Sequence, residues 1–357
     1  MKTARYDRQR ILKGFGEEGQ AKLKAAKILV VGAGGLGVPV LTYLNAMGVG
    51  TLGIADADLV SESNLHRQVI YKENQIGLPK VEAIKDNLQA QNSETIINVY
   101  KSFLTIDNAL EIIANYDVVV DASDNFPTRY LVNDACVILK KPLVYGALHG
   151  FEGQVSVFNY DNGPTYRCLF PKMPKVDAIP NCNEHGILGV LPGIIGNLQA
   201  LETVKVITEI GEVLSGVLFL YDGLSQRTQR MQFNTIPENL ELSELQDSYE
   251  LDCNIPVKSI EAIEIEKLIT DFDIELIDVR TKEEFVQNHL AKAKHIPLLD
   301  LKQRKKEIDT RKPVYVICQS GIRSLKAAVL LKELLPNTEI INVSGGMNQL
   351  SSYADFS

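Results

Sequence analysis

Glycines with the spacing of a phosphate-binding loop lie near the start of the chain. Gly32, Gly34 and Gly37 follow a G-x-G-x-x-G pattern between an apolar run and a helical pattern. Such glycines let the backbone approach a phosphate, and the N-terminus of the following helix favours its negative charge. Asp56 ends the next apolar run, where a carboxylate can hold a ribose hydroxyl. The spacing predicts a nucleotide site.

More charged and polar side chains follow these strands than a hydride-transfer site needs. Arg and Lys side chains can offset charge that builds on an α-phosphate and on leaving pyrophosphate, and a carboxylate near phosphates can hold Mg²⁺. The set therefore favours transfer of an adenylyl group from a nucleoside triphosphate over a dehydrogenase reaction. It consists of Asp58, Asn64, Arg67, Gln68, Lys80, Asp124, Asn125 and Arg129.

A second reactive centre is predicted at Cys318, which follows the apolar run Val314–Ile317 and precedes a helical pattern. A strand–loop–helix of this kind aims backbone N–H groups and a helix N-terminus at the sulfur, which favours a thiolate or a persulfide anion. The predicted persulfide loop is Cys318, Gln319, Ser320, Gly321, Ile322 and Arg323. A phosphatase loop is the alternative, but only four residues separate Cys318 from Arg323, which suits sulfur better than a phosphate ester.

Two further cysteines have different predicted roles, because one is expected to be reactive and the other to be structural. Cys182 lies in the polar, glycine-flanked segment 180–186, next to His185, where a thiol can be exposed and reactive. A half-buried structural thiol is the alternative. Cys136 lies in an apolar helical stretch and is predicted to belong to the core.

Alternating strands and helices would position these groups. Apolar runs at 27–31, 51–55, 94–101 and 116–121 alternate with helical patterns, including 79–91 and 107–115, which predicts a parallel sheet with helices on both faces. Later strands are expected within 143–159 and 216–233, around a helix at 193–209. The acidic stretch 236–256 loses periodicity and is predicted to be a linker. A smaller α/β pattern follows, with strands at 276–279 and 314–317. The predicted division is a Rossmann-like domain over 1–235, a linker over 236–256 and a second α/β domain over 257–357.

Composition excludes several classes of protein. The 357 residues suit two domains, and the net charge of -8 argues against a broad nucleic-acid-binding surface. No apolar run reaches the roughly 18 residues of a membrane span, and the start of the chain lacks the apolar stretch of a secretory signal. Five cysteines are too few and too scattered for a disulfide framework. A reducing cytoplasm is the expected location.

Residues 4–234 resemble the MoeB/ThiF adenylyltransferases, which are bacterial relatives of the ubiquitin-activating enzymes. The resemblance rests on motifs that recur together in this order: Arg5–Gln9, Gly32–Gly37, Asp56–Asp58, Ser63–Gln68, Gly77–Lys80 and Asp121–Asn125. It implies an ATP site formed by Gly32, Gly34, Gly35 and Gly37 with the charged set.

The resemblance also assigns roles within that site. Asp56 would bind the ribose, Arg67 and Lys80 would contact phosphates, and Asp124 would hold Mg²⁺. Asn64 and Gln68 would line the same site. The family is homodimeric, so Arg8 would reach the ATP of the partner subunit, and Cys182 stands where the family has its reactive cysteine.

The chain departs from this family at its zinc site. Cys168 resembles the second residue of the family's first Cys-x-x-Cys pair, but Thr165 stands in the first place. The second pair should fall near 235–250, which has no cysteine, and Cys253 is single. Because a thiolate zinc site needs about four ligands, we expect no structural zinc and interpret Cys168 as a packing residue.

Residues 258–355 resemble the rhodanese domain. The motifs are Leu276–Arg280, Glu283–Phe285, His289–Ala293, His295–Pro297, the Cys318 loop and Ser344–Met347. One departure is Asn288, because a glycine commonly precedes the histidine in this family.

The two resemblances together imply adenylation of the C-terminal Gly-Gly of a ubiquitin-like sulfur carrier (MoaD/ThiS-like), followed by sulfur transfer from a Cys318 persulfide to form a thiocarboxylate. A cysteine desulfurase or thiosulfate would donate the sulfur. The slightly closer resemblance to MoeB favours molybdopterin biosynthesis over thiamine synthesis or tRNA thiolation. Two other classes stay open: an NAD-dependent dehydrogenase fused to a redox domain, and a non-enzymatic module that binds ubiquitin-like tails.

Overall fold

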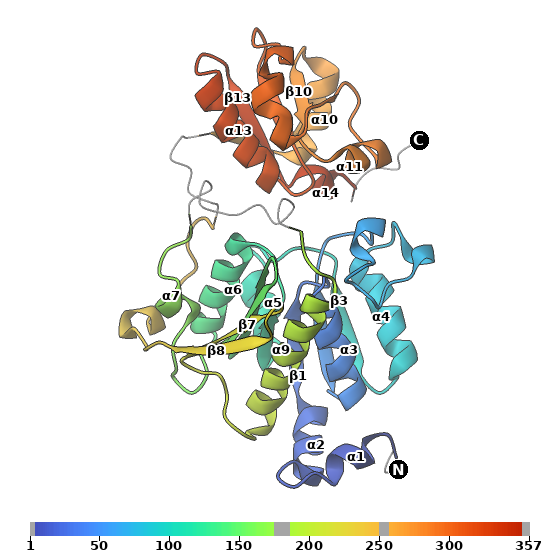
Figure 1. The fold of residues 1–357 in the computed structure, drawn as a ribbon, viewed down its shortest axis with the longest axis vertical. Helices are drawn as coiled ribbons and strands as arrows, with labels where there is room; N and C mark the ends of the chain where they lie inside the picture. Colours follow the sequence, from blue (N-terminus) through green and yellow to red (C-terminus); the bar gives the residue numbers. More distant parts are fainter. Residues whose placement is uncertain (1–3, 175–185, 250–256, 352–357) are drawn as a thin grey trace. The chain divides into compact units, whose positions relative to one another are not determined.

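The computed structural model describes residues 4–174, 186–249 and 257–351, which form two compact units (Figure 1). The first unit contains the described residues up to Tyr249, and the second contains those from Val257 onward. Two α/β units in this order were expected from the alternation of patterns along the chain.

The first unit is built on an eight-stranded sheet with the strand order β3-β2-β1-β4-β5-β6-β7-β8. The strands β3 to β5 pair in parallel, whereas β6 to β8 continue the sheet in antiparallel fashion. The expected strand regions 143–159 and 216–233 each resolve into a pair of strands. The bounds are β1 (Lys27–Val31), β2 (Thr51–Ala55), β3 (Ile96–Tyr100), β4 (Val118–Asp121), β5 (Leu143–His149), β6 (Glu152–Phe158), β7 (Val217–Asp222) and β8 (Arg227–Gln232).

Helices cover both faces of this sheet, as the continuous apolar strands require. Along β1, Ile28 and Val30 pack with α3, α4 and α9, while Leu29 and Val31 pack with α5 and α6 on the other face. The helices of the unit are α1 (Asp7–Arg10), α2 (Gly16–Ala25), α3 (Gly37–Met47), α4 (Lys80–Gln91), α5 (Ala109–Ala114), α6 (Phe126–Ile138), α7 (Tyr166–Leu169) and α9 (Val190–Thr208). Cys136 is fully buried in the second of these clusters, which confirms the expected core position.

One helix among the described residues has the length and the apolar composition needed to cross a membrane. The sequence has no uninterrupted apolar run of that length. This helix is α9, with a mean hydropathy of 1.2, and 56% of the window is buried inside the protein. Its buried face includes the polar side chains of Gln199, Glu202 and Thr203. Because α9 packs against α3 and the sheet, its apolar composition is accounted for by core packing.

The second unit is a five-stranded parallel sheet with the strand order β11-β10-β12-β13-β9. Helix α13 packs on one face, and α10 and α14 pack on the other. The strands are β9 (Lys258–Glu261), β10 (Glu275–Asp278), β11 (Lys294–His295), β12 (Val314–Ile317) and β13 (Ile340–Ser344). The helices are α10 (Ala262–Asp271), α11 (Lys282–Gln287), α12 (Leu301–Arg304), α13 (Ile322–Leu334) and α14 (Gly346–Ser351).

The first part of the predicted linker packs on the first unit, which corrects that prediction. Leu245 and Tyr249 join the core cluster beneath α6, and the Tyr249 hydroxyl donates a hydrogen bond of 2.8 Å to Asp134. Two apolar side chains anchor the segment although its composition is acidic. Residues 250–256 lie outside the described residues, and the domain boundaries themselves stay a prediction.

Replacing Tyr249 by phenylalanine should reduce the stability of the first unit. The change removes a buried hydrogen bond to a carboxylate, which typically contributes about 1.5–3 kcal/mol. Asp134 keeps its ion pair with Arg167, so we expect the lower end of that range. Urea unfolding of the full chain would measure it, with Tyr43→Phe as a matched control because Tyr43 is 54% exposed. Equal free energies of unfolding for the two variants would contradict the assignment of 237–249 to this unit.

Candidate functional site

The glycine-rich loop lies between β1 and α3, the strand–loop–helix context that a phosphate loop requires. Gly32 has a φ of +102°, and a Cβ there would lie 2.7 Å from the carbonyl oxygen of Ala122. A Cβ on Gly37 would overlap the carbonyl oxygen of Gly32. Both positions therefore require glycine.

Asp56 braces this loop from the end of β2. Its side chain is 7% exposed, and its two carboxylate oxygens accept hydrogen bonds of 2.7 Å from the backbone N–H groups of Ala33 and Asp58. Burial raises the pKa of the Asp56 carboxyl, and the nearby charge of Lys80 opposes this effect. Each oxygen can still accept a further hydrogen bond, as a ribose hydroxyl would require.

Lys80 begins α4 and forms an ion pair with Asp58, with 2.8 Å between Nζ and Oδ2. Only 5% of the lysine side chain is exposed. Burial alone would lower the pKa of Lys80, but the carboxylates of Asp56 and Asp58 outweigh it and raise the pKa above its ordinary value. Lys80 is thus held as a cation beside the phosphate loop.

Asn64, Arg67 and Gln68 lie on the segment between β2 and α4. The Arg67 guanidinium donates to the side-chain oxygen of Asn64 at 2.8 Å and to the backbone carbonyl of Ser63 at 2.9 Å. Gln68 is buried beside the position of a Cβ on Gly34, and its Oε1 has no partner within the described structure. A buried amide oxygen without a partner is costly, so a ligand donor at this place would stabilise it.

The segment after β4 contributes Asp124 and Asn125. Asp124 is exposed, and its charge raises the pKa values of Lys80 and Arg129 while opposing the burial that lowers the pKa of Arg67. These interactions place Asp124 near three cations. Asn125, by contrast, is occupied as the N-cap of α6, because its side-chain oxygen accepts the N–H of Thr128 at 2.9 Å.

The fold therefore brings the predicted nucleotide residues together at the carboxyl ends of β1, β2 and β4, where ligands bind in open α/β sheets. The sequence did not single out Tyr71 or Gln199. The Tyr71 hydroxyl donates to the carbonyl of Ala33 in the phosphate loop at 2.8 Å, and Gln199 of α9 donates to the carbonyl of Asp121 at 2.8 Å. Neither lies in a motif, so only the fold reveals them.

Arg8 is the one described member of the predicted set that lies away from this cluster. It is exposed on α1, which packs at the far ends of α3 and α4: Gln9 donates to the carbonyl of Met47, and Tyr6 accepts from Asn92. The phosphate loop and Lys80 lie instead at the N-terminal ends of α3 and α4. The two ends of each helix are about 15–18 Å apart, because the helices have 11 and 12 residues. Arg8 therefore cannot serve the site of its own chain.

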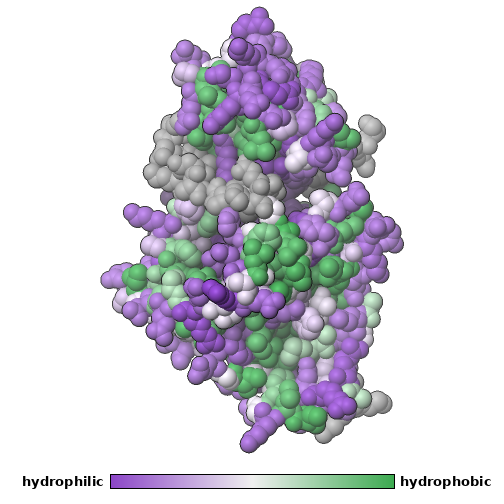
Figure 2. Space-filling model, in the orientation of Figure 1, coloured by the Kyte–Doolittle hydropathy of each residue, from purple (hydrophilic) through white to green (hydrophobic). Residues whose placement is uncertain are grey.

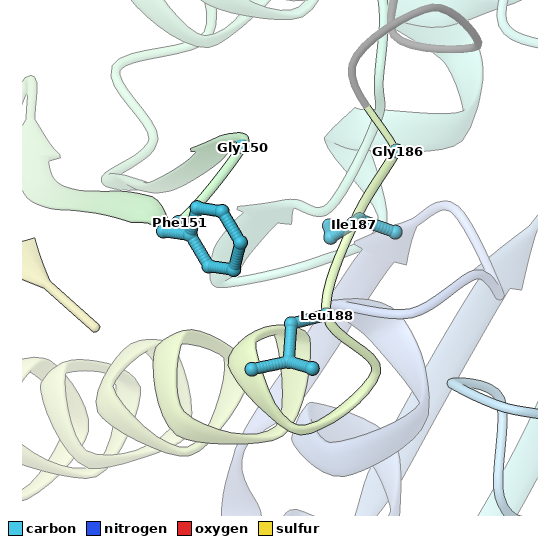
Figure 3. A pocket seen from close by; sticks show the side chains of 5 residues that line it. All are labelled: Gly150, Phe151, Gly186, Ile187 and Leu188. Carbon is cyan, nitrogen blue, oxygen red and sulfur yellow. The ribbon is translucent and has the colours of Figure 1, made fainter. Parts of the chain in front are cut away.

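Cys182 and His185 lie outside the described residues, but the chain resumes beside a shallow pocket. Gly186, Ile187 and Leu188 line this pocket of about 250 Å³ together with Gly150 and Phe151 (Figure 3). Phe151 and Leu188 are about half exposed, and Leu224 is 71% exposed. Leu224 lies close to Phe151, because the N–H of its neighbour Gly223 donates to the carbonyl of Phe151. Figure 2 shows apolar side chains gathered over part of the first unit's surface, which suits protein contact.

Cys168 is surrounded by hydrogen-bond donors. Its sulfur accepts from the N–H of Ile236 at 3.3 Å, from the N–H of Thr165 at 3.4 Å and from the amide of Asn239 at 3.7 Å. Burial would raise the pKa of Cys168, but these hydrogen bonds outweigh it and lower the pKa. Among the described residues, no group of three or more His, Cys, Asp or Glu side chains could hold a metal. The expectation of no structural zinc stays a prediction.

Cys318 directly follows β12 within the second unit, and α13 begins at Ile322, the strand–loop–helix that was predicted. The cysteine is fully buried, and its sulfur accepts the N–H of Gly321 at 3.1 Å. Gly321 has a φ of +88°, and a Cβ there would lie 2.9 Å from the backbone nitrogen of Gly345. Glycine at this position lets the loop close around the sulfur.

The start of α14 is hydrogen-bonded to the backbone of the Cys318 loop. The N–H groups of Met347 and Asn348 donate to the carbonyls of Cys318 and Gln319, each at 2.9 Å. A Cβ on Gly346 would overlap the Cys318 carbonyl oxygen. This contact explains why the segment Ser344–Met347 belongs to the motif set, although it lies far from Cys318 in sequence.

Arg280 holds the side chain of Gln319, the residue that follows Cys318. It is 1% exposed, forms an ion pair with Asp278 and donates to the side-chain oxygen of Gln319 at 2.9 Å. Its remaining donors bind the side-chain and backbone oxygens of Asn288 at 3.0 and 2.6 Å. Asn288, the departure from the rhodanese pattern, is thus a partner of this buried arginine, a role that its place in the sequence did not reveal.

Comparison with known proteins identifies the two units. The ThiF family matches residues 6–241, which is most of the first unit and more than half of the chain. The chain belongs to the ThiF family. A rhodanese-like domain matches residues 261–353 of this ThiF-family chain, in agreement with the Cys318 loop.

Curated relatives combine the same two parts. "Adenylyltransferase and sulfurtransferase MOCS3" from Culex quinquefasciatus is 40% identical over 99% of this chain and 88% of its own length. "Sulfur carrier protein adenylyltransferase" from Thermus thermophilus is 52% identical over 65% of this chain and 88% of its own length. The chain is therefore an adenylyltransferase that also carries a sulfurtransferase domain.

Solved structures share the fold of the first unit. E. coli MccB, in a crystal structure with AMPCPP and MccA, superposes with a TM-score of 0.59 at 22% identity, covering 68% of this chain and 74% of that one. A structure of MccB with ATP gives 0.55 at 24% identity, covering 62% and 67%. This likeness establishes the adenylation fold.

Proposed function

We propose that this chain activates the C-terminal glycine of a ubiquitin-like sulfur-carrier protein with ATP and converts it into a thiocarboxylate with sulfur carried on Cys318. The observation that carries the first half is the cluster of Lys80, Asp58, Arg67 and Asp124 around the phosphate loop. The second half rests on the Cys318 loop. The Thermus relative's name, which specifies a sulfur carrier protein, supports the substrate.

The first reaction would be an in-line displacement at the α-phosphate of ATP. A carboxylate oxygen of the carrier's terminal glycine attacks the α-phosphorus, the bond to the β-phosphate oxygen breaks, and pyrophosphate leaves. Lys80 and Arg67 offset the negative charge that builds on the phosphates. Asp56 would orient the ribose. Asp124 would hold Mg²⁺, which usually binds through one or two carboxylates together with substrate phosphates and offsets phosphate charge there.

The second reaction would transfer sulfur. The terminal sulfur of a Cys318 persulfide attacks the acyl carbon of the adenylate, the bond from carbon to phosphate oxygen breaks, and AMP leaves. The product is an acyl disulfide between carrier and Cys318. A second thiolate, for which we propose Cys182, attacks the Cys318 sulfur of that disulfide, so the carrier leaves as a thiocarboxylate and the two cysteines are joined. A reductant such as a cellular thiol then restores both.

The carrier and the pathway are the finer part of this proposal. The exposed apolar residues Phe151, Leu188 and Leu224 would contact the carrier's globular body. A 41% identical relative from Gracilaria tenuistipitata, covered over 92% of its length, is named "Probable molybdopterin-synthase adenylyltransferase", which supports molybdopterin biosynthesis. Thiamine synthesis and tRNA thiolation are the alternative pathways. We place the reaction in a reducing cytoplasm, because Cys318 must remain available as a thiol or persulfide.

The rival activities find less support. A phosphatase needs its loop arginine for the phosphate ester, but both terminal nitrogens of Arg323 bind Glu284 at 2.7 and 2.6 Å. An NAD-dependent dehydrogenase has little use for two cations and two carboxylates around its phosphate loop. A pure binding module has no need of a fully buried cysteine with a loop N–H donated to its sulfur.

The position of Arg8 leads us to propose a homodimer in which each site uses Arg8 of the partner subunit. In a twofold dimer, two variants that are broken in different chains can rebuild one intact site. We expect Arg8→Ala and Asp124→Asn each to lose ATP–pyrophosphate exchange as homodimers. A heterodimer of the two, purified through two different tags, should regain about half of the wild-type activity, because one of its two sites is complete.

The same experiment has a clear contrary result. If Arg8 acted within its own chain, each chain of the heterodimer would keep one defect, and no exchange would return. A heterodimer of Asp107→Asn and Asp124→Asn is the matched control: its activity should come only from the chain with intact Asp124. Sedimentation of each preparation would check that all are dimers of equal stability.

A further inference from the structure

Arg323 closes the persulfide loop and is bound by a carboxylate on another helix. Its two terminal nitrogens donate to the two oxygens of Glu284, on α11, at 2.7 and 2.6 Å. The arginine side chain is 13% exposed and the glutamate 29%. A paired fork of this kind is among the stronger ion-pair geometries, because both hydrogen bonds are charge-assisted.

The pair lies within electrostatic reach of the sulfur. Burial would lower the pKa of Arg323, but Glu284 outweighs this effect, and a thiolate at Cys318 would raise the pKa further. The second guanidinium beside the loop, Arg280, is paired with Asp278 and buried. Both arginines next to the predicted persulfide are therefore charge-compensated.

We propose that Glu284 is a specificity-determining residue that withholds Arg323 from anionic sulfur donors and so makes thiosulfate a poor donor for Cys318. This inference rests on the proposed function, in which Cys318 carries the sulfur. Thiosulfate is a dianion, and a free guanidinium would bind its sulfonate oxygens through two parallel hydrogen bonds. With Glu284 in place, those oxygens meet an ion pair with no net charge instead of a free guanidinium.

The reaction that Glu284 would suppress balances without a further reagent. The Cys318 thiolate attacks the outer sulfur of thiosulfate, an S–S bond forms to Cys318, and the bond to the sulfonate sulfur breaks. Sulfite leaves with the electron pair. Cyanide then removes the outer sulfur as thiocyanate and restores the thiolate, so turnover can be followed. A freed Arg323 would favour both thiosulfate binding and the charge on departing sulfite.

Glu284→Gln in the full chain tests this. Glu284 also closes a capping box at the start of α11, in which its carboxylate accepts the N–H of Thr281. Glutamine can fill that role, so the variant should fold. We expect the KM for thiosulfate to fall about tenfold, which corresponds to about 1.4 kcal/mol. Sulfate should become a competitive inhibitor of the variant but not of the wild type.

Glu283→Gln is the matched control, because Glu283 is the exposed neighbour on the same helix and the charge change is identical. Glu284→Asp, which keeps the charge but shortens its reach, should lower the KM less than Glu284→Gln. An equal KM for thiosulfate in Glu284→Gln and Glu283→Gln would overturn the proposal, as would a loss of kcat and stability with unchanged KM. If mass spectrometry found no sulfur on Cys318 with thiosulfate or a cysteine desulfurase, in any variant, the proposed function itself would fail.

Discussion

Replacing Cys318 by alanine is expected to abolish thiocarboxylate formation on the carrier while adenylation continues. The sulfur is the only part of the side chain that can carry a persulfide, and no backbone group can replace it. Cys318 is fully buried in the second unit, whereas the nucleotide cluster belongs entirely to the first unit. The two activities should therefore separate in this variant.

Two measurements on one preparation would show this separation. Mass spectrometry of the carrier reports the thiocarboxylate, and ATP–pyrophosphate exchange reports adenylation. Cys168→Ala is the matched control, because Cys168 is a half-buried cysteine of the first unit. Wild-type rates of thiocarboxylate formation in Cys318→Ala would contradict the assignment of Cys318 as the sulfur carrier.

Asp124→Asn is expected to lower ATP–pyrophosphate exchange by about 10²-fold or more. Loss of one preorganised group that stabilises transition-state charge commonly costs 10²–10³ in rate. Asp124 is exposed, so its amide should leave the fold unchanged. The loss would thus report on chemistry rather than on stability.

Asp107→Asn provides the control, because Asp107 is another exposed aspartate of the same unit and the change in charge is identical. Thermal unfolding of both variants should match that of the wild type. An Asp124→Asn variant with full exchange activity would exclude Asp124 from the catalytic site and weaken the proposed role in holding Mg²⁺.

The parts of the fold that follow local patterns were predictable. The buried runs at Lys27–Val31 and Val314–Ile317 are strands, and glycines and Cys318 follow them at the ends where ligands bind. The backbone conformation determines which residue can occupy these positions, since Gly32, Gly37 and Gly321 have no room for a side chain or adopt positive φ. Such signals are readable without tertiary information.

Other parts depend on contacts between distant residues, which no local pattern encodes. The acidic segment before Tyr249 was predicted to be a linker, yet a tyrosine and a leucine bind it to the first unit. The side-chain oxygen of Asn125 caps α6, a role that its motif did not indicate, and its contact with nucleotide stays a prediction. Glu284 and Asn288 bind arginines that are 39 and 8 residues away in sequence.

The measurement that tests the central claim most directly is ATP–pyrophosphate exchange by the wild-type chain with a panel of Gly-Gly-tailed carrier proteins. We predict carrier-dependent exchange with one member of the panel, which would also identify the pathway. Removal of the carrier's last glycine should stop it. ATP binding without exchange for any carrier would contradict the proposed substrate. The absence of ATP binding would contradict the adenylation mechanism itself.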